Sequence, residues 1–405
     1  MKTVRPLALS LVVPVLALAA GCSSEKRTPP REPPKDYARP LPPGMMALEG
    51  PIPVWEWPDF YAGLDPDLGH RRRLLSAVDR SLEYMQAPSS QKYYPYKGIT
   101  HDRVVASLAA FKDLAAKARD RDSFQKALEE RFEVYRSVGW NGEGEVLFTA
   151  YCEPIYEGSR TPDARYRFPL YEKPADLVKD PEGKPLGRQL EDGRIVPCPT
   201  RREIETGAQE WVKGLELVWL ADRFDAYVVH VQGSARIKLP DGKEMRIGYA
   251  GKTDRPYASV GEALIQDGKI DRNSLSLRGI REYFRSHPED LDIYLARNES
   301  FVFFMEREGG PYGSLGVPVT QGASLATDKA VYPRASLAFV DTTMPEQGGY
   351  EGSRPYKTFV LDQDTGGAIR SAGRADIFLG TGPAAENLAG YVRQEGKLYY
   401  LFLKE

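Results

Sequence analysis

Three aspartates near the C-terminal end of the chain have the residue type and the setting that carboxylate catalysis requires. They are Asp328, Asp364 and Asp376, and the last two stand beside glycines or other small residues at the expected boundaries of strands. Small neighbours allow a backbone and a substrate to approach closely. Carboxyl groups in one cleft push each other's pKa values apart, so that one stays protonated while its neighbours stay charged. Because aspartates in β-rich chains usually serve turns, the residues alone leave a turn role open for each.

Patterns for other kinds of catalysis are absent from the 405-residue sequence. The four histidines are scattered, and none lies at metal-ligand spacing with another histidine or a cysteine. Neither a serine nucleophile elbow nor a phosphate-binding or dinucleotide-binding motif occurs. The sequence therefore predicts neither a metal nor a cofactor. Its formal net charge of −2 gives no indication of a nucleic-acid partner.

Apolar residues at helical spacing predict that the first folded segment is helical. Thr100 is a plausible N-cap there, and Thr200 with Glu203 and Ser259 with Glu262 have capping-box patterns farther along. The expected helices, in chain order, are 74–85, 104–114, 122–138, short helices after Thr200 and Ser259, and 274–297 with a break at His287-Pro288.

Short apolar runs predict strands from Glu145 onward, and the pattern becomes almost purely β after Phe304. Pro240-Asp241-Gly242 has the composition of a hairpin turn. The expected strands include 146–151, 226–231, 245–249, 336–340, 358–361, 377–379 and 398–403. Many short strands that end at the C-terminus fit a small closed barrel. We therefore predict a mixed α+β protein that is mainly β.

The N-terminal residues have the pattern of a secretory signal peptide over 1–21. Lys2 and Arg5 precede an apolar run that is shorter than the roughly 20 residues of a membrane-spanning helix. Small residues then lead into Cys22, which resembles a bacterial lipobox whose cysteine is acylated and anchors the protein in a membrane. Since no aspartate follows this cysteine, we expect an outer-membrane lipoprotein that faces the periplasm. An ordinary signal peptide with an incidental cysteine is the alternative.

Residues 22–54 are rich in proline and charge, which predicts an extended tether. The remaining chain, about 350 residues, exceeds what one compact core usually holds, so two domains are expected. Besides Cys22, only Cys152 and Cys198 remain, and an oxidising compartment would permit them to pair. The sequence leaves that pairing open.

The segment from Asp328 to Phe378 resembles the three-aspartate domain of the membrane-bound lytic transglycosylase A family. Blocks upstream carry the same resemblance in the same order, so that it extends from about Phe148 to the C-terminus. They include Glu157-Gly158-Ser159-Arg160-Thr161, Val231-Gln232-Gly233-Ser234-Ala235-Arg236, Tyr249-Ala250-Gly251-Lys252, Pro256-Tyr257-Ala258-Ser259 and Asn298-Glu299-Ser300-Phe301.

The resemblance implies a double-psi β-barrel with an inserted second β-rich domain. The barrel would comprise 55–150 plus 308–405, and the insert 151–307. Asp376 would act as catalytic acid and base, with Asp364 and Asp328 as supporting carboxylates. The residues implied to line a saccharide groove are Gln232, Lys252, Tyr257 and Ser259.

The activity that the resemblance implies is cleavage of the β-1,4 bond between N-acetylmuramic acid and N-acetylglucosamine without water, which leaves a 1,6-anhydromuramyl end. The implied partners are peptidoglycan glycan strands and cell-wall synthesis complexes. The implied enzyme is an exotransglycosylase, although the residues themselves do not distinguish action at strand ends from action within strands. Two alternatives remain: a non-catalytic peptidoglycan-binding lipoprotein, and a polysaccharide hydrolase that uses Asp364 and Asp376 as a carboxylate pair.

Overall fold

The computed structural model describes residues 35–405 except 65–67, 182, 208–209, 272–274 and 347–351. The expected signal peptide and the expected acylation site, Cys22, lie outside the described residues. Among those described, no helix combines the length and the apolar character needed to cross a membrane. Cys152 and Cys198 are both buried and both carry free thiols, so they do not form a disulfide.

The larger sheet contains eight strands in the order β1-β2-β17-β14-β15-β13-β16-β3. Because β17 pairs with β3 as well as with β14, six of these strands return on themselves as a ring. Within the ring the pairs β13–β15 and β16–β3 are parallel, and the other pairs are antiparallel. The strands are β1 Leu48–Glu49, β2 Phe132–Ser137, β3 Val146–Glu153, β13 Ser324–Ala326, β14 Leu337–Pro345, β15 Ser353–Asp364, β16 Arg374–Thr381 and β17 Arg393–Leu403.

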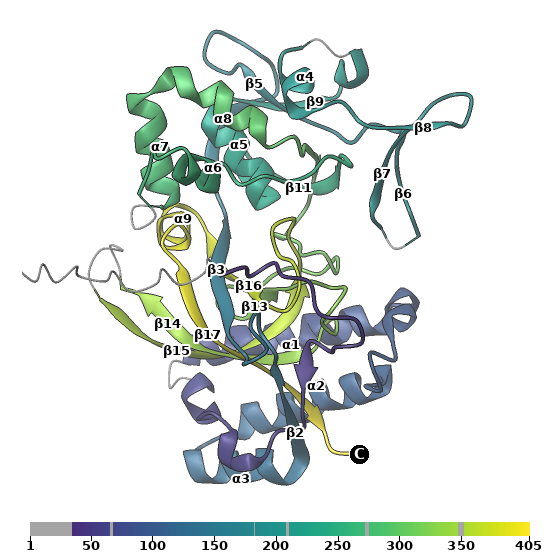
Figure 1. Ribbon diagram of the computed structural model, residues 1–405, viewed down its shortest axis with the longest axis vertical. Coiled ribbons are helices and arrows are strands. Elements are labelled where there is room, and N and C mark those ends of the chain that lie inside the picture. The colour runs from purple at the N-terminus through teal and green to yellow at the C-terminus, as the bar shows by residue number, and fades with distance from the viewer. Residues whose placement is uncertain (1–34, 65–67, 182, 208–209, 272–274, 347–351) are drawn as a thin grey trace, which may run out of the picture. The chain divides into compact units, whose positions relative to one another are not determined.

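Three helices, α1 (Leu68–Gln86), α2 (His101–Lys117) and α3 (Arg121–Arg131), pack against this sheet in the lower half of Figure 1. Their apolar faces meet the ring through aromatic side chains. The Phe111 ring in α2 lies 4.6 Å from that of Phe359 in β15, which lies 4.9 Å from Phe339 in β14. Such contacts bury large apolar areas and stabilise the helices on the strands.

The strands between Ile155 and Glu306 pair only among themselves in the described structure. Six form the order β12-β11-β10-β4-β9-β5, and three short strands form β6-β7-β8. In Figure 1 these elements occupy the upper half, and β3 runs toward them from the ring. The strands are β4 Ile155–Ser159, β5 Phe168–Tyr171, β6 Leu177–Lys179, β7 Pro185–Gln189, β8 Ile195–Val196, β9 Glu216–Leu220, β10 Ser234–Lys238, β11 Glu244–Lys252 and β12 Val302–Glu306.

Four helices of the same part, α5 to α8, gather at the upper left of Figure 1 around a shared apolar cluster, whereas α4 lies beside β9 and contributes Ile204 to another cluster. Several begin at the predicted caps: Thr200 forms a full capping box with Glu203, and the Ser259 hydroxyl accepts the Glu262 N–H. The helices are α4 Arg201–Glu205, α5 Arg223–Gln232, α6 Val260–Gln266, α7 Leu277–Ser286 and α8 Leu291–Arg297; α9, Pro383–Ala389, follows β16. The predicted break between α7 and α8 is confirmed at His287-Pro288.

Two expected elements are wrong. The helix predicted over 122–138 ends at Arg131, and β2 follows at once. Phe132 and Val134 are buried where β2 pairs with β17, so tertiary pairing overrides the helical spacing. The strand predicted over 226–231 is part of α5, whose N-cap Asp222 accepts the Asp225 N–H. Residues 226–230 of α5 are all buried, which is why the run is continuously apolar.

Part of the expected tether belongs to the folded body. Ala47 and Leu48 are almost completely buried, and Leu48 pairs with Ser137 at the start of β1. Farther toward the N-terminus, the Tyr37 ring meets the Trp140 ring edge-on at 5.9 Å. The proline-rich composition hides these contacts, because only a few apolar residues among the prolines make them.

A buried ion pair lies inside the ring. Lys329 and Asp362 are 5% and 0% exposed, and the Lys329 ammonium contacts the Asp362 carboxylate. The same carboxylate accepts hydrogen bonds from the Thr327 hydroxyl at 2.8 Å and the Tyr400 hydroxyl at 2.7 Å. Burial lowers the pKa of Lys329, and the Asp362 charge opposes that shift. The carboxylate thus compensates a charge that would otherwise be costly to bury.

We predict that Asp362→Asn lowers the free energy of unfolding by about 3–5 kcal/mol, because Lys329 would remain buried without its counter-charge. Urea denaturation of the purified protein measures the change. The matched control is Asp341→Asn in β14, whose partner Lys357 forms an ion pair that is 26–31% exposed. That variant should lose at most about 1 kcal/mol. Equal losses in the two variants would contradict the role assigned to the buried pair.

Candidate active site

The short strand β13 brings Asp364 and Asp376 together. Ala326 in β13 pairs with Asp364 in the parallel strand β15 and with Asp376 in the antiparallel strand β16. Neighbouring strands lie about 4.8 Å apart, so the two aspartates flank one residue at adjacent sheet positions. The structure therefore brings these two aspartates, 12 positions apart in the sequence, to adjacent positions in the sheet.

Asp376 is held by its neighbours on two strands. Its carboxylate accepts a hydrogen bond from the hydroxyl of Thr149, the residue directly opposite it in β3. Arg374 Nε donates to the same oxygen at 3.2 Å, and its terminal nitrogen donates to Thr149 Oγ1 at 3.0 Å. The Asp376 side chain is still 15% exposed, so a ligand can reach it. These hydrogen bonds fix the orientation of the Asp376 carboxyl group.

Asp364 terminates β15 in a less polar setting. Its Oδ1 accepts the backbone N–H groups of Ser314 and Thr365, both at 2.8 Å. Burial raises the pKa of the Asp364 carboxyl, although the Tyr151 hydroxyl, these backbone hydrogen bonds and the charge of Lys329 oppose the shift. Asp364 and Asp376 thus differ in environment as two carboxyl groups with different roles would.

Tyr151, at the end of β3, lies between the two aspartates. Its ring packs against Phe378 with centroids 5.1 Å apart. The hydroxyl is buried beside the Asp364 carboxyl group. Burial raises the pKa of Tyr151 well above its usual range, and the nearby Asp364 and Asp376 carboxyl groups add to the effect. Tyr151 is therefore a neighbour of both carboxyl groups.

The Asp328 carboxylate binds backbone N–H groups of loop residues. One carboxylate oxygen accepts the Ala330 N–H at 3.0 Å, and the other accepts the Ser371 N–H at 2.7 Å. Ser371 has a φ of 61°, a left-handed conformation that side chains rarely adopt. Asp328 therefore stabilises the segment that connects Asp364 to Asp376.

A cavity of about 600 Å³ lies where this segment meets the insert strands. Three of the four predicted groove residues, Lys252, Tyr257 and Ser259, line it, as does Arg374. Burial raises the pKa of the Tyr257 hydroxyl, with Arg374 and Asp376 close enough to influence it. The Ser259 hydroxyl is also occupied in capping α6. The cavity thus joins predicted residues of the insert to the aspartate region.

Gln232 has a different position from the other predicted groove residues. It is the last residue of α5, and its side-chain oxygen accepts the Cys152 N–H at 3.0 Å. It is not among the residues that line the cavity. In this structure Gln232 connects α5 to β3 beside Tyr151.

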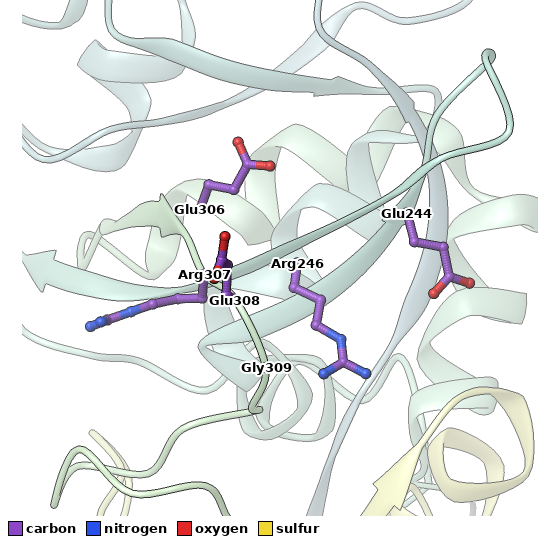
Figure 2. Close-up of a pocket in the computed structure, with 6 residues that line it drawn as sticks. All are labelled: Glu244, Arg246, Glu306, Arg307, Glu308 and Gly309. Carbon is purple, nitrogen blue, oxygen red and sulfur yellow. The ribbon is translucent and has the colours of Figure 1, made fainter.

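A second depression, of about 650 Å³, lies on β11, β12 and the residues that follow (Figure 2). Figure 2 shows the side chains of Arg246, Glu306 and Arg307 pointing in different directions. Arg246 donates to the Gly310 carbonyl, and Glu306 pairs with Arg160 at 2.8 Å. None of the predicted site residues lines this depression, so we place the candidate site in the other cavity.

Sequence reasoning missed several residues of the site. Arg374 and Thr149 bind Asp376, and Tyr151 lies between the aspartates. The one available signal was the position of Arg374, two residues before Asp376 on the same strand face. Thr149 becomes a neighbour only through the β3–β16 pairing. In the described part of the chain, no group of three histidine, cysteine or acidic residues is arranged to hold a metal ion.

We predict that Asp364→Asn makes the protein more stable than the wild type at pH 8, and that the difference shrinks toward pH 4. Because the pKa of Asp364 is raised in the folded state, the folded protein binds more protons than the unfolded chain, and stability falls as pH rises through the folded value. Asparagine cannot ionise, so the variant does not lose this stability as pH rises. Thermal unfolding of both proteins between pH 4 and pH 8 measures the difference in stability.

Asp163→Asn is a control in which the expected change of stability with pH has the opposite sign. Backbone N–H groups of Tyr166 and Arg165 lower the pKa of Asp163, so its carboxylate adds stability as pH rises, and the variant should be the less stable protein at pH 8. Parallel pH profiles of wild type and Asp364→Asn would contradict the raised pKa.

Comparisons with known proteins agree with this arrangement. The sequence profile of the MltA specific insert domain matches residues 147–305, and that of the 3D domain matches residues 323–402. Membrane-bound lytic murein transglycosylase A of Vibrio cholerae is 30% identical over 270 residues, which are 66% of this chain and 68% of that protein. The Escherichia coli protein of the same name is 27% identical over 274 residues, covering 66% and 69%.

Solved structures show the same fold. A membrane-bound lytic murein transglycosylase from Agrobacterium tumefaciens superposes with a TM-score of 0.71 at 30% identity, covering 87% of this chain and 96% of that one. Escherichia coli MltA with bound chitohexaose has a TM-score of 0.68 at 22% identity, covering 91% and 96%. With the paired aspartates and the insert both in place, this chain belongs to the membrane-bound lytic murein transglycosylase A family.

Proposed function

We propose that this protein is a lytic transglycosylase that cleaves the β-1,4 bond between N-acetylmuramic acid and N-acetylglucosamine in peptidoglycan and leaves a 1,6-anhydromuramyl end. The observation that carries the proposal is the position of Asp364 and Asp376 on either side of Ala326, beside a cavity shared with the insert. Relatives named as murein transglycosylases, and the related structure that holds chitohexaose, support a glycan strand as substrate.

Asp376 is the proposed acid and base. Its protonated carboxyl donates to the glycosidic oxygen as the bond to C1 of the muramyl sugar breaks and positive charge develops at C1. The resulting carboxylate takes the proton of the C6 hydroxyl while that oxygen bonds to C1. The proton returns to Asp376, and no water is consumed. Thr149 and Arg374 stabilise the carboxylate between these steps.

The remaining site residues are assigned supporting roles. Asp364 and Tyr151 supply a carboxyl group and a hydroxyl to the substrate beside Asp376, and Asp328 keeps their connecting segment in place. Lys252, Tyr257 and Ser259 line the saccharide groove. Gln232 acts indirectly, through its hydrogen bond to β3.

We also propose that the six-stranded ring is a double-psi β-barrel. The ring has two parallel pairs, β13–β15 and β16–β3, as crossing connections require. The proposed domains are 55–150 plus 308–405 for the barrel and 151–307 for the insert, and the passage from β3 to β4 at Pro154 supports this division.

Export and anchoring are the last part of the proposal. The lipobox-like sequence at Cys22 supports an acylated outer-membrane lipoprotein that faces the periplasm, where peptidoglycan and its synthesis complexes lie. The names of the relatives, which describe membrane-bound proteins, support a membrane association.

Purified protein incubated with peptidoglycan should release 1,6-anhydromuropeptides, identified by chromatography and mass spectrometry. Asp376→Asn should lower the rate by about 10²–10⁴, because general acid–base catalysis contributes roughly that factor. Asp341→Asn, which removes an aspartate of β14 that pairs with Lys357, should retain wild-type turnover.

The products distinguish the competing functions. Reducing muramyl ends would show a hydrolase instead, and binding without any product would show a peptidoglycan-binding protein. Wild-type turnover by Asp376→Asn would refute the assignment of the acid.

Cys22→Ser should abolish labelling by a palmitate analogue in bacterial cells and move the protein from the membrane fraction to the soluble periplasmic fraction. Acylation needs the Cys22 thiol. The N-terminal apolar run is removed with the signal peptide, so it does not hold the mature protein in the membrane. Cys198→Ser, at a buried thiol, is the control and should leave labelling unchanged. An unlabelled wild type would contradict the proposed anchor.

A further inference from the structure

Two cations stand side by side in the cavity without a counter-charge. Lys252 is the last residue of β11, and Arg370 lies in the segment between β15 and β16; both line the cavity. Among the described residues, neither side chain has an ion pair, a hydrogen bond or an aromatic partner. Two other cations of the lining are engaged, since Arg374 binds Asp376 and Arg255 donates to the Cys198 carbonyl at 2.6 Å.

The pair lies close to the proposed catalytic residues. A methyl group placed on Gly367 would lie 3.7 Å from Lys252 Nζ and 4.0 Å from Tyr257 Cβ, so the ammonium lies over the segment that follows Asp364. Arg370 belongs to the same segment, four residues before Arg374. A group bound between Lys252 and Arg370 would therefore belong to a ligand that also reaches Asp376.

The charge of the cavity lining favours an anion. Its ionisable residues are five cations, Lys184, Lys252, Arg255, Arg370 and Arg374, and two acids, Asp254 and Glu262. Asp254 accepts the Cys198 N–H at 2.9 Å, and the Glu262 backbone N–H donates to Ser259. Burial and the neighbouring Arg370 charge lower the pKa of Lys252, with no carboxylate acting in the opposite direction.

Two adjacent like charges in a partly buried place destabilise each other unless an anion compensates them. A neutral sugar offers only hydroxyl and amide dipoles. A carboxylate offers two oxygens that can accept charge-assisted hydrogen bonds from both an ammonium and a guanidinium. The lining is thus more complementary to an acidic saccharide than to a neutral one.

We propose that Lys252 and Arg370 form a binding site for a carboxylate of the glycan substrate and give the protein a preference for acidic strands over neutral ones. The inference rests on the proposed function, since it concerns the same cavity. The carboxylate belongs either to the lactyl ether of a muramyl sugar whose peptide has been removed, or to a stem peptide. Either source supplies the same chemistry.

Calorimetric titration of the mature full-length chain tests the proposal, with Asp376→Asn as the reference so that the ligand stays intact. Three oligosaccharides of equal length serve as probes: muramyl strands without peptides, muramyl strands with stem peptides, and an uncharged chito-oligosaccharide. The test variant adds Lys252→Gln and Arg370→Gln. The matched control adds Lys243→Gln and Arg194→Gln, which remove two charges paired with aspartates of hairpin turns outside the cavity.

The reference and the control should bind at least one acidic strand about tenfold more tightly than the neutral one, a factor typical of one charge-assisted hydrogen bond. The test variant should lose that difference, and raised salt should weaken only the acidic interaction. Preference for the peptide-free strand identifies the lactyl carboxylate, and preference for the stem-bearing strand alone identifies the peptide.

Equal affinity of the reference for acidic and neutral strands would overturn the proposal, as would a preference that survives in the test variant. These results are independent of the proposed reaction. A protein that releases no 1,6-anhydro products could still show the binding preference, and an active one could lack it.

Discussion

The structure around the candidate site depends on the pairing of one very short strand with two others. All three residues of β13 pair with β15 in parallel orientation, and Leu325 and Ala326 also pair with β16 in antiparallel orientation. This pairing sets the separation of Asp364 and Asp376 through backbone hydrogen bonds rather than through side-chain packing. A shift of register by one residue would turn one of the two carboxyl groups to the other face of the sheet.

The interior of the ring next to β13 contains buried charged and polar side chains. Lys329 follows β13 and pairs with Asp362, two residues before Asp364, so the ion pair ties the end of β13 to the end of β15. Thr327 and Tyr400 occupy the remaining acceptor positions of Asp362. Buried and satisfied polar groups of this kind define one arrangement of strands more strictly than apolar contacts do, because any other arrangement leaves a charge unpaired.

The site also needs the insert. The ring supplies Arg374, which binds Asp376, whereas the insert supplies Lys252 and Tyr257 to the lining of the same cavity. β3 of the ring ends at Glu153 and continues into β4 of the insert after one residue, Pro154, so a short connection joins the two parts.

Local signals in the sequence determined the features that depend on a few neighbouring residues. The Thr100 and Thr200 caps, the turn at Pro240-Asp241-Gly242 and the break at His287-Pro288 lie where they were predicted, since each results from hydrogen bonding or backbone restriction within one turn. Glycines and short strands in the sequence also drew attention to Asp364 and Asp376, which lie on either side of Ala326 in the folded chain.

Tertiary structure alone decided what those aspartates contact. The residues 132–137 became a strand, and 226–231 a helix, because pairing with β17 and burial on all sides outweighed the local pattern. Thr149 and Tyr151 reach Asp376 and Asp364 from more than 200 positions away, and Lys252 meets Arg370 across more than 100. The separation of two residues along the sequence carries no information about such contacts. Strand register and the placement of the insert bring these residues together only when the chain folds.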